Sequence, residues 1–218
     1  MKSVIIGAGT YGQVYLAYLK EAGVNVIGFI DDNPNEHSKV YDKVPVLGGR
    51  EILPSLKETH SVECVYCPIG NNIVRVELLE YARELGYITP NFIHKDVIIS
   101  PQVHIASEGV YILPKTLVMP YVNIDKDVMI SVGANIIHHS TLKQGVFVSN
   151  GVNLGASLIA EKRAYIGMGA TVMTGVKIVG QDCLIGAGAV VIKDVPNGAV
   201  MAGVPAKVIK YKDEYRQS

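Results

Sequence analysis

Residues 124–190 read IDKDVMISVGANIIHHSTLKQGVFVSNGVNLGASLIAEKRAYIGMGATVMTGVKIVGQDCLIGAGAV, a stretch that repeats with a period of six. Every sixth residue is aliphatic, and this phase runs to Val190 with no residue inserted or lost. Two positions earlier lies a second restricted site, mostly small or β-branched, which ends with Asp182 and Gly188. The twelve aliphatic positions are Ile124, Ile130, Ile136, Leu142, Val148, Leu154, Ala160, Ile166, Val172, Ile178, Leu184 and Val190. Glycine recurs three positions after the aliphatic site, at Gly133, Gly145, Gly151, Gly169 and Gly175.

This period excludes an α-helix, because a helical apolar stripe recurs every three to four residues. A short strand followed by a tight turn does produce it, with one aliphatic side chain pointing inward per strand and glycine at the corner. Hexapeptide repeats of this kind are typical of a parallel β-helix, in which each coil buries its aliphatic side chains against its neighbours. An ordinary sheet of short strands is the alternative, but it would not be expected to keep one phase through eleven intervals.

The composition limits the class of protein. The chain has 218 residues with 20 basic and 20 acidic side chains, so its charge gives no reason to expect binding to nucleic acid or to an anionic membrane. It has no run of 18 apolar residues, so we expect no membrane insertion. The start, MKSVIIGAG, lacks the apolar stretch of a signal peptide, and three cysteines are few. We therefore expect a cytoplasmic protein, with Cys64 and Cys67 as core residues rather than a redox or metal pair.

The first 90 or so residues lack the six-residue repeat and instead alternate between strand-like and helix-like segments. A short apolar run at 3–6 leads into the glycine-rich turn at 7–12, a helical stretch to about Ala22, and a second strand at 25–30 that ends at Asp31-Asp32. This is a βαβ unit with a G-x-G-x-x-G turn and acidic residues about 20 positions later, which is typical of nucleotide-binding α/β domains. The helix N-terminus would offer N–H groups to a phosphate.

A third strand is predicted at 62–66, a helix at about 73–85, and a last strand at 87–92. The sequence therefore predicts two domains: an α/β, Rossmann-like domain at 1–93 and an all-β parallel β-helix at 94–218, with a polar C-terminal tail from Tyr211 that we expect to be frayed. Residues 97–119 form a weaker start of the repeat.

Five segments together resemble the bacterial hexapeptide acyltransferases that acetylate nucleotide-linked amino sugars, and the related sialic-acid O-acetyltransferases. In chain order they are Ile6-Gly7-Ala8-Gly9, Phe29-Ile30-Asp31-Asp32, Ile69-Gly70-Asn71-Asn72, Phe92-Ile93-His94-Lys95 and Ala202-Gly203-Val204-Pro205-Ala206-Lys207. The resemblance implies that the first domain holds the nucleotide sugar and that a left-handed β-helix binds acetyl-CoA as cosubstrate. It also implies a homotrimer with active sites between subunits, a role in surface glycan or lipopolysaccharide synthesis, and no metal.

Two histidines interrupt the small, apolar texture of the repeat, and acetyl transfer to an amine needs a base of this kind. The resemblance makes His138, two positions after Ile136, the base. The family often has Asp or Glu next, whereas this chain has His139, a neutral ring that could orient His138 but supplies no carboxylate. If both lie on a strand they point apart, so contact between them is not assured. The alternative is that both are polar residues on an exposed coil.

The resemblance also implies a coenzyme site. Phe147 stands where the family frequently has a histidine near the thioester, so a developing oxyanion would depend on the backbone N–H of Ala156. Met168 and Gly186 match further coenzyme contacts, or else are ordinary corner residues.

The matching nucleotide-sugar positions lie in the first domain, with Tyr11 in place of a common family histidine. They are Gly9, Thr10, Tyr11, Asp31, Asp32, Gly70 and Asn71. A solvated strand end is the alternative for the two aspartates.

Four functions stay open. The first is acetyl-CoA-dependent N-acetylation of a nucleotide-linked amino sugar, expected to be a 4-amino-4,6-dideoxyhexose. The second is O-acetylation of a sugar such as sialic acid. The glycine-rich turn suggests an NAD-dependent oxidoreductase, but the sheet is small for one. The missing acid and Phe147 leave room for a non-catalytic scaffold.

Overall fold

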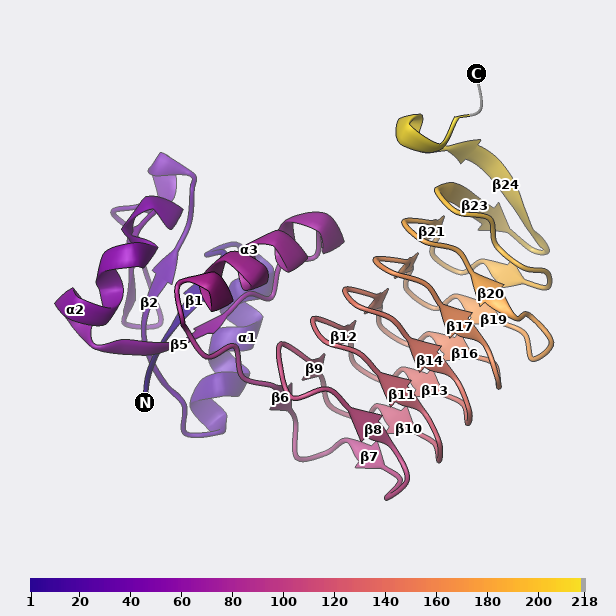
Figure 1. The fold of residues 1–218 in the computed structure, drawn as a ribbon, viewed down its shortest axis with the longest axis horizontal. Coiled ribbons are helices and arrows are strands. Elements are labelled where there is room, and N and C mark those ends of the chain that lie inside the picture. The colour runs from indigo at the N-terminus through magenta and orange to yellow at the C-terminus, as the bar shows by residue number, and fades with distance from the viewer. Residues whose placement is uncertain (217–218) are drawn as a thin grey trace. The chain divides into compact units, whose positions relative to one another are not determined.

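The computed structural model describes residues 1–216, which form two compact units, one of residues 1–92 and one that begins at Ile93 (Figure 1). Each unit has its own hydrophobic core. An α/β unit followed by a parallel β-helix confirms the fold class expected from the sequence.

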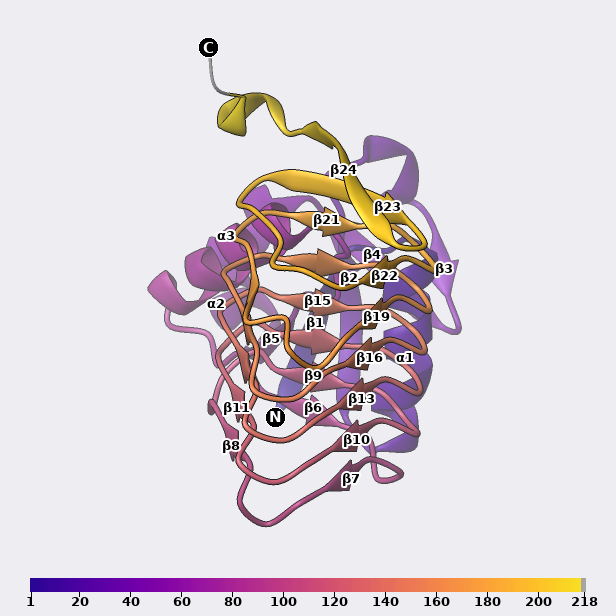
Figure 2. The ribbon, with the colours of Figure 1, turned by 90° about the vertical axis from the view of Figure 1, so that its right-hand side faces the viewer.

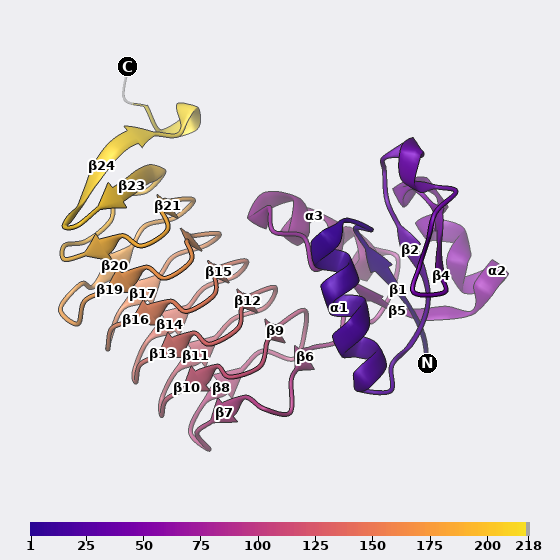
Figure 3. The same cartoon turned by 180° about the vertical axis from the view of Figure 1, so that it is seen from behind.

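The first unit is built on one five-stranded sheet with the order β3-β4-β2-β1-β5. All neighbours run parallel except β3, which pairs antiparallel with β4. α1 packs on β1 and β2, and α3 packs on β5 (Figure 3). The strands are β1 (Lys2–Ile6), β2 (Asn25–Ile30), β3 (Val40–Tyr41), β4 (Val44–Gly48) and β5 (Val62–Tyr66), and the helices are α1 (Thr10–Glu21), α2 (Leu56–His60) and α3 (Asn72–Glu84). Short 3-10 helices occupy Pro34–Glu36 and Arg50–Ser55.

The fourth parallel strand is not where the sequence predicted it. β4 supplies it, whereas the predicted strand at 87–92 contributes an isolated bridge between Ile88 and Cys64. β4 was missed because its run of apolar residues is short and includes Pro45.

The second unit is a coil of short parallel strands that stack into three sheets (Figure 2). One coil takes eighteen residues, since Leu117 pairs with Asn135. Sheet I contains β7 (Ile98–Ile99), β10 (Leu117–Val118), β13 (Asn135–Ile136), β16 (Asn153–Leu154), β19 (Thr171–Val172) and β22 (Val190–Val191). Sheet II contains β8 (His104–Ile105), β11 (Asn123–Ile124), β14 (Thr141–Leu142), β17 (Ile159–Ala160) and β20 (Ile178–Val179). Sheet III contains β6 (Phe92–Ile93), β9 (Tyr111–Ile112), β12 (Met129–Ile130), β15 (Phe147–Val148), β18 (Tyr165–Ile166), β21 (Leu184–Ile185), β23 (Ala199–Gly203) and β24 (Ala206–Tyr211).

The predicted phase of the repeat is correct as far as Val172 and wrong beyond it. Ile159 pairs with Ile178, nineteen residues on, so one extra residue lies in the corner at 173–177. Inward-facing positions then move by one, and the buried residues are Val179, Ile185 and Val191 instead of Ile178, Leu184 and Val190. Cys183 and Ala189 likewise replace Asp182 and Gly188 at the small site. The weak start of the repeat also comes from one extra residue. The inward-facing Ile112 lies seven positions after Ile105, where the regular repeat has six.

The C-terminal segment is anchored as far as the structure describes it, contrary to the frayed tail that the sequence predicted. β24 pairs antiparallel with β23, and a 3-10 helix follows at Asp213–Tyr215. The Tyr215 hydroxyl donates to Asp182 at 2.6 Å, which fixes this helix to the last full coil. Residues 217 and 218 of the predicted tail lie outside the described residues.

Candidate active site

The two histidines lie in a turn and not on a strand. His138 and His139 follow β13 at the corner where sheet I passes into sheet II. His139 has a φ of 59°, a left-handed conformation that histidine adopts more readily than β-branched residues do. The turn rotates the two side chains toward each other and brings their rings into contact, which the sequence had left open.

The two rings form a hydrogen-bonded pair. The Nδ1 atoms of His138 and His139 are 3.0 Å apart, and the rings meet edge to face. The ring of His139 also packs against Tyr121, one coil earlier, with centroids 4.7 Å apart. His138 is half-buried and His139 is exposed. Because one nitrogen must carry the proton of this hydrogen bond, His139 can fix the tautomer and orientation of His138.

Ala156 occupies the same corner position as His138, one coil further along. The Ser157 N–H donates to the His138 carbonyl oxygen at 3.0 Å, which ties the two coils together. The Ala156 N–H, expected as the oxyanion donor, is directed at Thr174 Oγ1, 3.2 Å away. Thr174 lies at the same corner position one coil beyond Ala156, in the same six-residue phase as His138, and was not among the predicted site residues.

The other predicted coenzyme residues lie elsewhere on the β-helix. Phe147 is on β15 of sheet III, nearly fully buried, with its ring 4.9 Å from that of Tyr165. Met168 and Gly186 lie at the corner between sheets III and I, where the Gly188 N–H donates to the Met168 carbonyl oxygen. Within one chain, the structure therefore brings His138, His139 and Ala156 together but separates them from Phe147, Met168 and Gly186.

The close stacking of coils requires glycine at position 155 and leaves little room for a side chain at position 186. A Cβ on Gly155 would lie 2.5 Å from the Thr174 nitrogen, and one on Gly186 would lie 3.1 Å from the Met201 carbonyl oxygen. Gly186 thus has a structural reason to be glycine, whether or not it contacts a coenzyme.

In the first unit, the predicted nucleotide-sugar residues lie at one edge of the sheet, the edge formed by the carboxyl ends of the parallel strands. The strands β1, β2 and β5 run parallel, so the loops that follow them lie at the same edge. These loops carry the predicted residues Gly9, Asp31, Asp32, Gly70 and Asn71, and the predicted Thr10 and Tyr11 begin α1 directly after the first loop.

Asp31 joins two of these loops. Its carboxylate accepts hydrogen bonds from the Ala8 N–H at 2.8 Å and the Asn33 N–H at 2.9 Å. The neighbouring Gly12 is needed for the helix to approach β1, because a Cβ there would lie 1.9 Å from the Gly7 carbonyl oxygen. The glycine-rich turn is therefore held in place by a side chain from the next strand.

Asp32 and Asn71 are each engaged in local structure. Asp32 accepts from the Arg50 backbone N–H at 2.8 Å and from Arg50 Nε at 2.6 Å, and this side-chain hydrogen bond lowers the pKa of the Asp32 carboxyl. Asn71 caps α3, with its Oδ1 accepting from the N–H groups of Ile73 and Val74. Arg50 is a residue of this edge that the sequence analysis missed.

Arg75 holds the loop after β5. Its side chain is fully buried, and its Nη1 donates to the Ile69 carbonyl oxygen at 2.8 Å. The neighbouring Gly70 is exposed, and nothing lies within 4 Å of the place a Cβ would take there.

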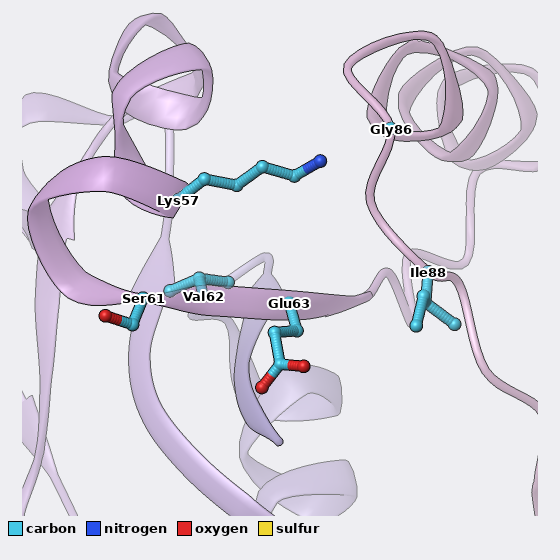
Figure 4. Close-up of a pocket in the computed structure, with 6 residues that line it drawn as sticks. All are labelled: Lys57, Ser61, Val62, Glu63, Gly86 and Ile88. Carbon is cyan, nitrogen blue, oxygen red and sulfur yellow. The ribbon is translucent and has the colours of Figure 1, made fainter.

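A cavity of about 410 Å³ lies at the opposite edge of the same sheet, where β5 begins (Figure 4). Lys57 extends over it and donates to the Leu85 carbonyl oxygen at 3.0 Å (Figure 4). The cavity is lined by Lys57, Ser61, Val62, Glu63, Gly86 and Ile88, and by none of the predicted site residues.

Neither a metal-binding cluster nor a membrane-spanning helix is found in residues 1–216. That part of the chain contains no group of three or more His, Cys, Asp or Glu side chains placed to hold a metal ion. Nor does it contain a helix with the length and apolar character needed to cross a bilayer. Cys64, Cys67 and Cys183 are all buried and unbridged.

Comparison with known proteins places these observations in a family. The PglD N-terminal domain family matches residues 2–82. Perosamine N-acetyltransferase from Caulobacter crescentus, solved in complex with CoA and GDP-perosamine, is 30% identical with a TM-score of 0.90, covering 96% of this chain and 97% of that one. The acetyltransferase domain of PglB from Neisseria gonorrhoeae is 29% identical with a TM-score of 0.86, covering 95% and 99%.

The curated relatives match a shorter segment. A 2,3,4,5-tetrahydropyridine-2,6-dicarboxylate N-acetyltransferase from Clostridium perfringens is 50% identical over 56 residues, which is 26% of this chain and 23% of that relative's length. The likeness to the two solved sugar acetyltransferases, in contrast, spans both units. By its sequence and its fold, the chain belongs to the PglD-type family of hexapeptide-repeat sugar acetyltransferases.

Proposed function

We propose that this protein transfers the acetyl group of acetyl-CoA to the amine of a nucleotide-linked amino sugar, a 4-amino-4,6-dideoxyhexose. The observation that carries this proposal is the hydrogen-bonded pair of His138 and His139, one coil from the Ala156 amide. The likeness to a perosamine N-acetyltransferase solved with CoA and GDP-perosamine supports the choice of an amino sugar over a hydroxyl acceptor.

His138 acts as the base through Nε2. Its Nδ1 faces His139 Nδ1 at 3.0 Å, so a proton on His138 Nδ1 leaves the lone pair on Nε2. The sugar nitrogen attacks the thioester carbonyl carbon, a C–N bond forms, and Nε2 takes one proton from nitrogen. The C–S bond then breaks, and the same proton passes to the leaving sulfur to give the CoA thiol.

His139 is the positioning residue of this pair. By accepting from the Nδ1–H of His138, it holds the ring in the tautomer that exposes Nε2. Its own orientation is fixed by the left-handed turn and by the packing on Tyr121. As an uncharged partner it stabilises the imidazolium less than a carboxylate would, and we expect a correspondingly modest base.

The nucleotide sugar binds at the edge of the first unit that carries Gly9, Thr10, Tyr11, Asp31, Asp32, Gly70 and Asn71. The N–H groups in the first turn of α1 suit a phosphate, because Gly9 caps this helix without a side-chain hydrogen bond. Asp31 acts there by shaping the turn, since its oxygens accept from the Ala8 and Asn33 amides.

Acetyl-CoA is proposed to contact two separate parts of the β-helix, and this favours an assembly of several copies. Ala156 lies at the corner between sheets I and II, whereas Phe147, Met168 and Gly186 lie on sheet III and its corner with sheet I. A coenzyme that touches both groups would bridge two copies of the chain, consistent with the homotrimer that the resemblance implies. We propose that the enzyme works in the cytoplasm, where acetyl-CoA is made.

The test is an acceptor panel. Purified protein is mixed with acetyl-CoA and GDP-, UDP- or dTDP-linked 4-amino-4,6-dideoxyhexoses, and release of CoA thiol is followed with a thiol reagent. The matching sugars with a 4-hydroxyl group serve as controls. We expect thiol release and a product heavier by one acetyl group with an amino sugar only. Turnover confined to hydroxyl acceptors would replace this proposal with O-acetylation.

A further inference from the structure

The amide expected to stabilise the oxyanion is directed at another side chain of the same chain. The Ala156 N–H points at Thr174 Oγ1 over 3.2 Å, from one coil to the next. An amide has a single hydrogen, so while this bond is made the Ala156 N–H does not donate to a thioester. The donor that faces outward at this corner is then the Thr174 hydroxyl.

That hydroxyl is suited to donate. A threonine hydroxyl accepts through its lone pairs and carries one hydrogen of its own. Among residues 1–216 no acceptor for the hydrogen of the Thr174 hydroxyl is present, and this side chain is exposed. When an amide N–H donates to a hydroxyl oxygen, it polarises the O–H bond, and the hydroxyl becomes a stronger hydrogen-bond donor.

The position of Thr174 relative to the base fits the reaction. His138, Ala156 and Thr174 occupy equivalent positions in three successive coils, and stacked parallel strands are about 4.8 Å apart, so two coils span about 10 Å. The reaction needs a hydrogen bond of about 3 Å from base to nitrogen, an attack distance of about 3 Å, and a hydrogen bond of about 2.8 Å to the carbonyl oxygen. The spacing of these coils is therefore of the order that an attacking amine and a thioester need between a base and an oxyanion donor.

We infer that the Thr174 hydroxyl, polarised by the Ala156 N–H, donates a hydrogen bond to the thioester carbonyl oxygen and to the oxyanion that develops there. This inference rests on the proposed acetyl transfer. No proton is transferred by Thr174: the carbonyl π electrons move to oxygen as the C–N bond forms, and the hydroxyl stabilises the resulting charge. The role is that of an oxyanion donor supplied by a side chain, where a bare amide was expected.

The experiment compares Thr174→Val, which has nearly the same shape without the hydroxyl, with Thr174→Ser, which keeps it. We expect Thr174→Val to lower kcat by about 10- to 100-fold. That is less than the full loss of an oxyanion donor, because the Ala156 N–H is released and replaces part of the interaction. The KM for acetyl-CoA should change little, and Thr174→Ser should keep most of the wild-type kcat. Equal melting temperatures of the three proteins would confirm that both variants fold.

A second readout does not depend on turnover. The stretching frequency of the carbonyl group of [1-13C]acetyl-CoA, measured by difference infrared spectroscopy, should be lower when bound to wild type and to Thr174→Ser than when bound to Thr174→Val. Equal frequencies in all three proteins, or a higher kcat in Thr174→Val, would show that the hydroxyl does not donate and would overturn the inference.

The two readouts separate this inference from the proposed function. A wild-type protein that shifts the carbonyl frequency through Thr174 but acetylates no amino sugar would sustain the oxyanion donor and contradict the proposed acceptor. A wild-type protein that acetylates an amino sugar at a rate independent of Thr174 would support the proposed function and contradict the role of Thr174 as oxyanion donor.

Discussion

His138 and His139 face each other through their Nδ1 atoms at 3.0 Å, in a turn that places the second histidine in a left-handed conformation. Only one of these two nitrogens can carry the shared proton, so the pair has two forms. With the shared proton on His138 Nδ1, the lone pair on His138 Nε2 is free to accept a proton. With the shared proton on His139 Nδ1, a neutral His138 carries its own proton on Nε2, which is then not basic. The relationship therefore gives the two histidines different roles, which mutation can separate.

Replacing His138 with alanine should lower kcat on the order of 10²-fold or more, because it removes the Nε2 atom that takes the proton from the sugar nitrogen. Initial rates of thiol release at saturating acetyl-CoA would measure this. His104→Ala is the matched control, since His104 is an exposed histidine on β8 with no proposed role. A rate close to wild type in His138→Ala would remove His138 from the mechanism.

Replacing His139 separates ring packing from tautomer control. His139→Phe keeps an aromatic ring against Tyr121 but has no acceptor for the His138 Nδ1–H, and we expect kcat to fall about 10- to 100-fold with unchanged KM values. His139→Asn tolerates the left-handed turn and can accept through its amide oxygen, so it should retain more activity. The order of the two variants is decisive: if the phenylalanine variant is as active as the asparagine variant, the hydrogen bond has no catalytic role.

The six-residue repeat was enough to predict the β-helix and the position of His138. That the two histidines meet was not predicted, although the phase carried the signal, because His139 lies three positions after Ile136, where glycine recurs at the corners. The left-handed φ of His139 makes the contact, and left-handed corner positions here are also filled by Tyr121 and Ser157. Residue type at this corner thus gave no sign of its conformation.

The later phase error has a different origin. Beyond Val172 each strand as far as Val191 carries two adjacent aliphatic residues, Ile178-Val179, Leu184-Ile185 and Val190-Val191, so either phase looks regular. The signals that could have decided are Cys183 and Ala189, which are small, apolar and buried where the predicted phase has Asp182 and Gly188.

The corrected phase can be tested by mutation. Ile185 is fully buried, whereas Leu184 faces outward on β21. Ile185→Ala should lower the free energy of unfolding by about 2–5 kcal/mol, and Leu184→Ala by less than about 1.5 kcal/mol. Urea denaturation followed by circular dichroism gives both values. A larger loss of unfolding free energy for Leu184→Ala than for Ile185→Ala would contradict this correction and support the uninterrupted phase predicted from the sequence.

Asp31 provides a test of the nucleotide-sugar edge. Asp31→Ala removes the acceptor for the Ala8 and Asn33 amides, so the glycine-rich turn should lose its fixed shape. We expect the KM for the nucleotide sugar to rise about tenfold while the KM for acetyl-CoA stays the same. Glu63→Ala, at the opposite edge of the sheet, is the control and should change neither. An equal rise in both KM values would point to a general loss of structure instead of a local one.

Asp182 allows a prediction of stability against pH. Burial raises the pKa of its carboxyl, but the hydrogen bonds from Arg163, Tyr215 and Gln181 outweigh burial and lower the pKa to about 2. Its ordinary pKa is 3.8, so the folded protein binds this proton less readily than the unfolded chain does. The contribution, about 2 kcal/mol, is therefore fully present above about pH 4 and is lost as the pH falls toward 2.

Asp182→Asn should accordingly destabilise the protein at neutral pH, and its difference from wild type should shrink below about pH 4. The Tyr215 anchor should weaken with it, because Tyr215 donates to the same carboxylate. Asp213→Asn is the control: Asp213 is exposed and pairs with Arg216 at 3.1 Å on the surface, where an ion pair contributes little. Thermal unfolding of the three proteins across this pH range measures the effect. A melting temperature for Asp182→Asn equal to wild type at neutral pH would show that this cluster does not stabilise the last coil.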